Sequence, residues 1–140
     1  MNRRLDVSSQ QGFSLLELMV VVAVIAILSA IAYSSYTDQV VRSRRAAGAA
    51  CLQERAQFME RYYTTNLSYA GAPNPPACDA EVSPFYQVSF VADPTATAFT
   101  LQAVPQGAQA ERDTQCGTLT LDQQGSRGTS NEDTPASECW

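Results

Sequence analysis

The sequence predicts an α+β protein in which a long N-terminal helix packs on an antiparallel sheet of about four strands. Three observations predict it. The chain has an almost unbroken apolar run from residue 13 to residue 33, and residues 14–63 contain no proline. From residue 85 onward, short stretches alternate apolar with polar residues, as half-buried strands do. We therefore expect one helix that is half transmembrane, followed by a small sheet.

The apolar run begins directly after a short polar leader and contains one carboxylate. From Phe13 to Tyr33 it is about twenty residues long, which at ~1.5 Å per residue matches a hydrocarbon core of ~30 Å. Glu17 lies inside it, where an ionised carboxylate costs ~2.5 to 3.5 kcal/mol unless it finds a cationic partner. If the chain is cut after Gly12, the new α-amine lies four residues before Glu17, on the same face of a helix. A neighbouring copy's amine would serve equally well.

Two other interpretations of the N-terminus remain open at this stage. Arg3 and Arg4, with Ala30-Ile31-Ala32 as a small-residue cleavage site, fit an ordinary secretory signal. The other interpretation is a plain signal anchor with Glu17 near the membrane interface. The apolar part of a secretory signal is usually shorter, ~7 to 15 residues. Neither interpretation accounts for a Gly-Phe pair directly before the apolar run.

The stretch Gly12-Phe13-Ser14-Leu15-Leu16-Glu17 resembles the class III leader junction of type IV prepilins. The resemblance implies that residues 1–12 are a leader, that a prepilin peptidase cuts after Gly12 and methylates Phe13, and that Glu17 is the assembly glutamate. It also implies the partners: the peptidase/methyltransferase, other pilin subunits and the inner-membrane assembly machinery. Residues 13–33 would be the transmembrane and assembly half of the helix, and residues 34–140 a periplasmic or extracellular head.

The charge pattern excludes several function classes. The chain has 9 basic residues, all arginine, against 14 acidic ones, and beyond Arg61 only Arg112 and Arg127 are basic. Such an acidic head repels a phosphate backbone, so nucleic acid is not an expected partner, although Arg42, Arg44 and Arg45 could form a local basic patch. The absence of histidine removes the commonest general base and metal ligand.

No pair of carboxylates suggests catalysis. Glu54 and Glu60 do not share a helix face, and Glu111 with Asp113 lies in a predicted loop that nothing in the sequence would hold rigid. The Glu132-Asp133 pair is expected to be a solvated acidic loop, with weak calcium binding as the alternative. We therefore expect a protein that is not an enzyme and needs no cofactor or metal.

The four cysteines, Cys51, Cys78, Cys116 and Cys139, predict disulfides outside the cytoplasm. They include no Cys-x-x-Cys pair, and no histidine completes a zinc site. Four cysteines allow three connectivities. The prepilin resemblance favours Cys116 with Cys139, which closes a C-terminal loop and leaves Cys51 with Cys78. Arginines flank both sides of the apolar run, so only the cysteines favour an external C-terminus.

Within the head, the pattern predicts each element in turn. One helix is expected from Ser14 to about Tyr63, with a buried stripe that leaves Arg42, Arg45, Gln53, Glu60 and Arg61 outside it. The stripe comprises Tyr33, Tyr36, Val40, Ala47, Cys51, Phe58 and Tyr62, widened by Val41, Leu52, Met59 and Tyr63. Residues 64–83, rich in proline, are expected to form a long surface loop. Strands are expected at residues 85–91, 97–104, 116–121 and 126–130.

The stretch from Cys116 to Leu121, with the distal Cys139, resembles the C-terminal region of minor pilins related to the neisserial-type major pilin. The resemblance implies a structural minor pilin that is anchored in the inner membrane by a single pass, with a periplasmic C-terminus. It would then be assembled into, or prime, a pilus fibre used in motility or adhesion. The alternatives are a DNA-uptake or adhesin receptor pilin, and a pseudopilin of a type II secretion system.

Overall fold

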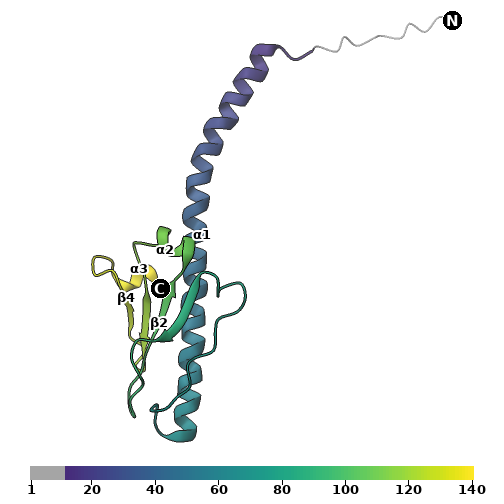
Figure 1. The fold of residues 1–140 in the computed structure, drawn as a ribbon. Helices are drawn as coiled ribbons and strands as arrows, with labels where there is room; N and C mark the ends of the chain where they lie inside the picture. The colour runs from purple at the N-terminus through teal and green to yellow at the C-terminus, as the bar shows by residue number, and fades with distance from the viewer. Residues whose placement is uncertain (1–11) are drawn as a thin grey trace, which may run out of the picture. The chain divides into compact units, whose positions relative to one another are not determined.

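A computed structural model describes residues 12–140 and confirms the predicted fold class (Figure 1). Helix α1 runs from Leu15 to Asn66. The strands are β1 (Tyr86–Phe90), β2 (Thr100–Pro105), β3 (Leu119–Asp122) and β4 (Arg127–Thr129), and they form one antiparallel sheet in the order β1-β2-β3-β4. Two short helices, α2 (Gly107–Arg112) and α3 (Ala136–Cys139), complete the fold.

The chain divides into two compact units. The first ends at Thr37 and, within the described residues, contains the N-terminal part of α1. The second runs from Asp38 to Trp140 and contains the rest of α1 together with the sheet. We call the second unit the head.

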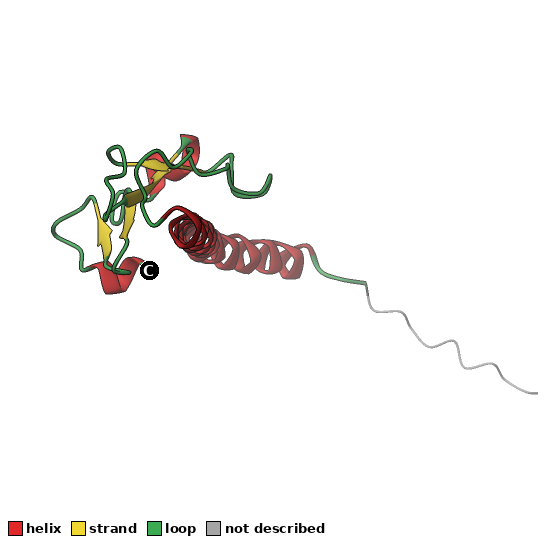
Figure 2. Cartoon of the chain, turned by 90° about the horizontal axis from the view of Figure 1, so that it is seen from below, coloured by secondary structure: helices red, strands yellow, loops and turns green. Residues whose placement is uncertain are grey.

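The core of the second unit lies between α1 and one face of the sheet, and Figure 2 shows the strands on one side of the helix. The predicted alternation places Tyr86 and Val88 of β1 in the core, and the β2 residues Leu101 and Ala103 are fully buried. In the strand register, Val88 of β1 lies opposite Ala103 of β2, and Leu101 of β2 lies opposite Leu121 of β3. The buried residues from α1 are Ala49, Cys51, Leu52 and Met59.

Helix and sheet approach each other closely at Gly48. A Cβ atom added there would lie 2.8 Å from the Cγ and Cδ2 atoms of the Tyr86 ring. Only glycine leaves enough room for the aromatic ring to lie against the helix backbone.

Two predictions about the face of α1 are wrong. The helical period predicts Tyr33 and Tyr36 in the buried stripe, but they are 68% and 69% exposed. Arg45 was placed outside the stripe, yet it is 7% exposed, because its guanidinium group forms an ion pair with a buried carboxylate. Val41, Cys51, Leu52 and Met59 are buried as predicted.

The element boundaries differ modestly from the predicted ones. Helix α1 continues to Asn66, where Leu67 adopts φ 53° and its N–H donates to the carbonyl of Tyr63 at 2.7 Å, an αL arrangement that ends many helices. Each strand is shorter than expected. Helices α2 and α3 were not predicted, since stretches of six and four residues are too short to show a helical period.

Candidate assembly site

The assembly site predicted from the sequence lies at the start of α1. Ser14 precedes the helix, and its Oγ accepts a hydrogen bond from the backbone N–H of Glu17 at 3.2 Å, which is the geometry of an N-cap. Glu17 is the acidic residue of the first helical turn, where the helix dipole favours negative charge. Ser14-x-x-Glu17 also has the spacing of a capping box, a signal that the sequence contained and our prediction missed.

Phe13 lies outside the helix, which changes one step of the prediction. An α-amine on Phe13 shares a helix face with Glu17 only if the backbone is helical from residue 13, whereas α1 begins at Leu15. Helical spacing therefore does not fix a pairing within one chain. Phe13 is 78% exposed. The predicted leader is described only at Gly12, because residues 1–11, with Arg3 and Arg4, lie outside the described residues.

On both sides of Glu17, the helix exposes apolar side chains. Its large apolar side chains between Leu15 and Ile31 are 47% to 77% exposed. Helix α1 is long and apolar enough to cross a membrane by length and composition, and none of its most apolar window is buried. A surface of this kind needs lipid or other apolar helices around it.

A buried polar network joins α1 to the C-terminal half of the head. Arg45 Nη1 lies 3.4 Å from Asp113 Oδ1, and Tyr86 donates its hydroxyl to Asp113 Oδ2 at 2.8 Å. Gln109 donates from Nε2 to Asp113 Oδ2 and to the carbonyl of Val41, each at 3.1 Å. Burial, and then the hydrogen bond to Asp113, raise the pKa of Tyr86. Asp113 is thus held firmly, contrary to the prediction of an unsupported loop.

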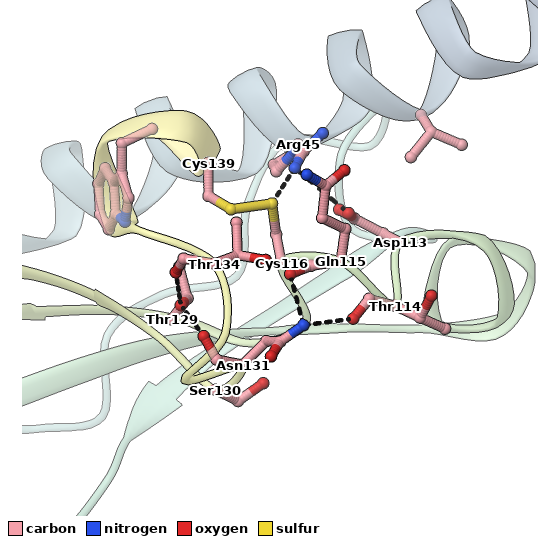
Figure 3. Close-up of a disulfide and its surroundings, with 12 residues drawn as sticks. Arg45, Asp113, Thr114, Gln115, Cys116, Thr129, Ser130, Asn131, Thr134 and Cys139 are labelled. Carbon is pink, nitrogen blue, oxygen red and sulfur yellow. Dashed lines mark hydrogen bonds and ion pairs between the residues drawn. A yellow bond between two sulfur atoms is a disulfide. The ribbon is translucent and has the colours of Figure 1, made fainter.

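Two disulfides fasten the head, and they pair Cys51 with Cys78 and Cys116 with Cys139. These are the pairs that the family resemblance implies. Figure 3 shows the second disulfide beside Arg45, which also donates to Cys116 Sγ. Asn131 donates from Nδ2 to the carbonyl of Gln115 at 2.9 Å and so ties the C-terminal segment to the segment before Cys116.

Arg42, Arg44 and Arg45, which the sequence offered as a local basic patch, do not form one. Arg45 is buried against Asp113, and the guanidinium of Arg44 lies 3.7 Å from the centroid of the Phe85 ring. Arg42 alone is exposed. Glu132 and Asp133 are exposed, and the described residues contain no group of three potential metal ligands.

Two family models match the sequence, and together they span most of it. Residues 34–120 match a family described as type IV minor pilin ComP, DNA uptake sequence receptor. Residues 7–33 match the prokaryotic N-terminal methylation motif. The second match covers the region that contains Gly12, Phe13 and Glu17.

Individual proteins with similar sequences are also fimbrial or pilin proteins. The chain is 29% identical over 130 residues to the fimbrial protein EcpC of Eikenella corrodens, covering 93% of this chain and 82% of the relative. It is 31% identical over 74 residues to the major pilin PilE1 of Neisseria gonorrhoeae, covering 49% of this chain and 45% of that one.

Solved structures share the fold. A type IV pilin from Shewanella oneidensis superposes with a TM-score of 0.54 at 32% identity, covering 71% of this chain and 97% of that one. The non-core minor pilin PilV of Neisseria meningitidis superposes with a TM-score of 0.52 at 22% identity, covering 70% of this chain and 94% of that one.

Proposed function

Because the chain belongs to the type IV minor pilins, we propose that it is a structural subunit that is processed between Gly12 and Phe13 and assembled into, or primes, a pilus fibre. On this proposal Phe13 is the methylated N-terminus of the mature subunit. The protein acts by assembly rather than by catalysis. Its membrane anchor is the apolar part of α1, with the head on the periplasmic side until the subunit enters the fibre.

Glu17 carries the assembly step in this proposal. Its carboxylate is exposed within a surface that is otherwise apolar, so in lipid or in a fibre core it is costly without a cation. The α-amine of a processed subunit supplies that cation, since the reference pKa of an α-amino group is ~7.7 to 8.0. Because Phe13 precedes the helix, the amine of a neighbouring subunit is the partner we favour. The pairing would then register one subunit against the next.

The proposal is tested by mass spectrometry of the protein from its own host. Membrane and sheared-pilus fractions should both contain a chain that begins at methylated Phe13. A chain that begins after Ala32 would instead identify a released periplasmic protein. A correctly processed chain that never enters the pilus fraction would contradict the assembly role while leaving the processing step intact.

A DNA-uptake receptor is the second candidate, favoured by the description of the family that residues 34–120 match. The head, however, has seven arginines against twelve carboxylates from Asp38 onward, and Arg45 is already paired with Asp113. Binding would need a local site rather than a basic surface. A gel-shift assay with the full chain in detergent micelles tests it: a complex that weakens steeply with added salt would support this second function.

A further inference from the structure

The head contains a pocket that the assembly role does not use. Its volume is about 390 Å³, which falls within the range of ~300 to 1,000 Å³ typical of small-molecule sites. It lies between α1 and the C-terminal segment, within the second unit. The lining residues are Arg42, Arg45, Ala46, Gln115 and Glu138 to Trp140.

The indole of Trp140 is held in place at the side of this pocket. Its Nε1 donates to the carbonyl of Gly128 at 3.1 Å, and the guanidinium of Arg127 lies 5.1 Å from the ring centroid. Arg127 itself is not among the residues that line the pocket. The preceding residue, Cys139, is buried and disulfide-bonded to Cys116. A ring fixed in this way loses little conformational entropy when a ligand packs against it.

Three polar side chains of different chemistry line the pocket together with Trp140. Arg42 offers only donors, Glu138 offers only acceptors when ionised, and Gln115 offers both. All three are exposed, so they are free to turn toward a ligand. A sugar ring needs this combination, because its C–H face packs on an aromatic ring while its hydroxyl groups both donate and accept hydrogen bonds. We propose that this pocket binds a neutral saccharide.

The charge of the pocket favours a neutral ligand over an anionic one. The positive charge of Arg45 is matched by Asp113 at 3.4 Å, and Glu138 offsets Arg42 within the pocket. The surrounding head carries a net negative charge, with seven arginines against twelve carboxylates. A phosphate group or a nucleic acid backbone gains little here, whereas an uncharged sugar meets no repulsion.

Trp140 is the only tryptophan in the chain, so its fluorescence reports directly on the pocket. The experiment is a titration of the full chain, in micelles of a detergent without a sugar headgroup, with lactose, maltose, cellobiose and N,N′-diacetylchitobiose. We expect a saturable change in emission with at least one of these sugars. Arg42→Gln and Glu138→Gln should each weaken it about ten-fold or more, since each removes a hydrogen bond to a charged group.

The matched controls are Arg61→Gln and Glu132→Gln, which change exposed residues of the same types outside the pocket; they should bind like the unchanged chain. The proposal is overturned if no sugar changes the emission, or if the two pocket variants bind as tightly as the controls. It is also overturned if a single-stranded oligonucleotide saturates the signal and the sugars do not. The assay does not depend on pilus assembly, so it fails or succeeds independently of the proposed function.

Discussion

Arg45 shows how single residues hold the C-terminal half of the head on α1. Its side chain is 9% exposed, and that of Asp113 is 1% exposed, so both charges are largely removed from water. Such a pair is stable only while each charge keeps its partner. Asp113 also accepts from Tyr86 and Gln109, so one carboxylate joins the first strand, α2 and α1.

Removing one member of this pair should destabilise the head strongly. We expect Asp113→Ala to lower the free energy of unfolding by about 3 to 5 kcal/mol, because it leaves the guanidinium of Arg45 buried without its partner. The double variant Arg45→Met/Asp113→Leu should recover much of the loss. Arg42→Met, on the exposed face, is the control and should change little. Chemical denaturation in micelles measures all three, and a loss below 1 kcal/mol for Asp113→Ala would contradict the account.

The direction in which Gly48→Ala changes stability tests the close packing of helix and sheet at this position. Glycine to alanine within a helix ordinarily stabilises by ~1 kcal/mol. Here the added Cβ would lie 2.8 Å from the Tyr86 ring, and overpacking of this kind costs ~1 to 3 kcal/mol. We therefore expect Gly48→Ala to lower the melting temperature. Ala50→Gly, at an exposed position of the same helix, should show the ordinary propensity cost. A higher melting temperature for Gly48→Ala would refute the close approach.

Tyr69 should make the head sensitive to alkaline pH. Burial, followed by its hydrogen bond to Glu60 at 2.9 Å, raises the pKa of Tyr69 to about 12 from its ordinary value of 10.0. The stability linked to this hydroxyl is complete below pH 10 and is lost as the pH rises through the folded pKa. The stability difference between the unchanged chain and Tyr69→Phe should therefore shrink from pH 9.5 to pH 11.5, values that bracket the ordinary pKa. A difference that stays constant over that range would show that Tyr69 is not coupled to folding.

At the scale of elements, α1 and the strands were predictable because their patterns are long and regular. The apolar run has the length of a membrane span, and the alternation of apolar and polar residues in β1 and β2 extends over several residues. The buried positions of the two strands follow that alternation. Arg45 and Asp113 were missed because their burial depends on a contact between residues 68 positions apart, which periodicity does not encode. Tyr33 and Tyr36 were misplaced because they match the helical period, although the head begins only at Asp38.

The two disulfides fasten different elements, so their removal should have separable effects. They close segments with sequence separations of 27 and 23 residues, and each should contribute roughly 3 to 3.5 kcal/mol in the chain-entropy model. We expect Cys51→Ser/Cys78→Ser to free the loop after α1. Cys116→Ser/Cys139→Ser should in addition release Trp140 and alter its fluorescence. Unchanged emission in the second variant would contradict the proposed rigidity of the pocket.

For the whole molecule, the sequence alone predicted the family, because the leader resemblance depends on a contiguous stretch, from Gly12 to Glu17. The role of these residues in assembly stays a prediction. The sequence did not predict the pocket, because Arg42, Gln115 and Trp140 are far apart in the chain and only the fold brings them together.

We propose that Glu17 drives incorporation of the subunit into the fibre. The most direct test is Glu17→Ala in the native host, with the mature N-terminus and the amount of protein in sheared pili measured together. We predict normal cleavage and methylation at Phe13, with loss of the subunit from the pilus fraction, while Glu54→Ala on the same helix is processed and incorporated normally. Full incorporation of Glu17→Ala into sheared pili would contradict the proposal, because it would show that the fibre forms without the carboxylate.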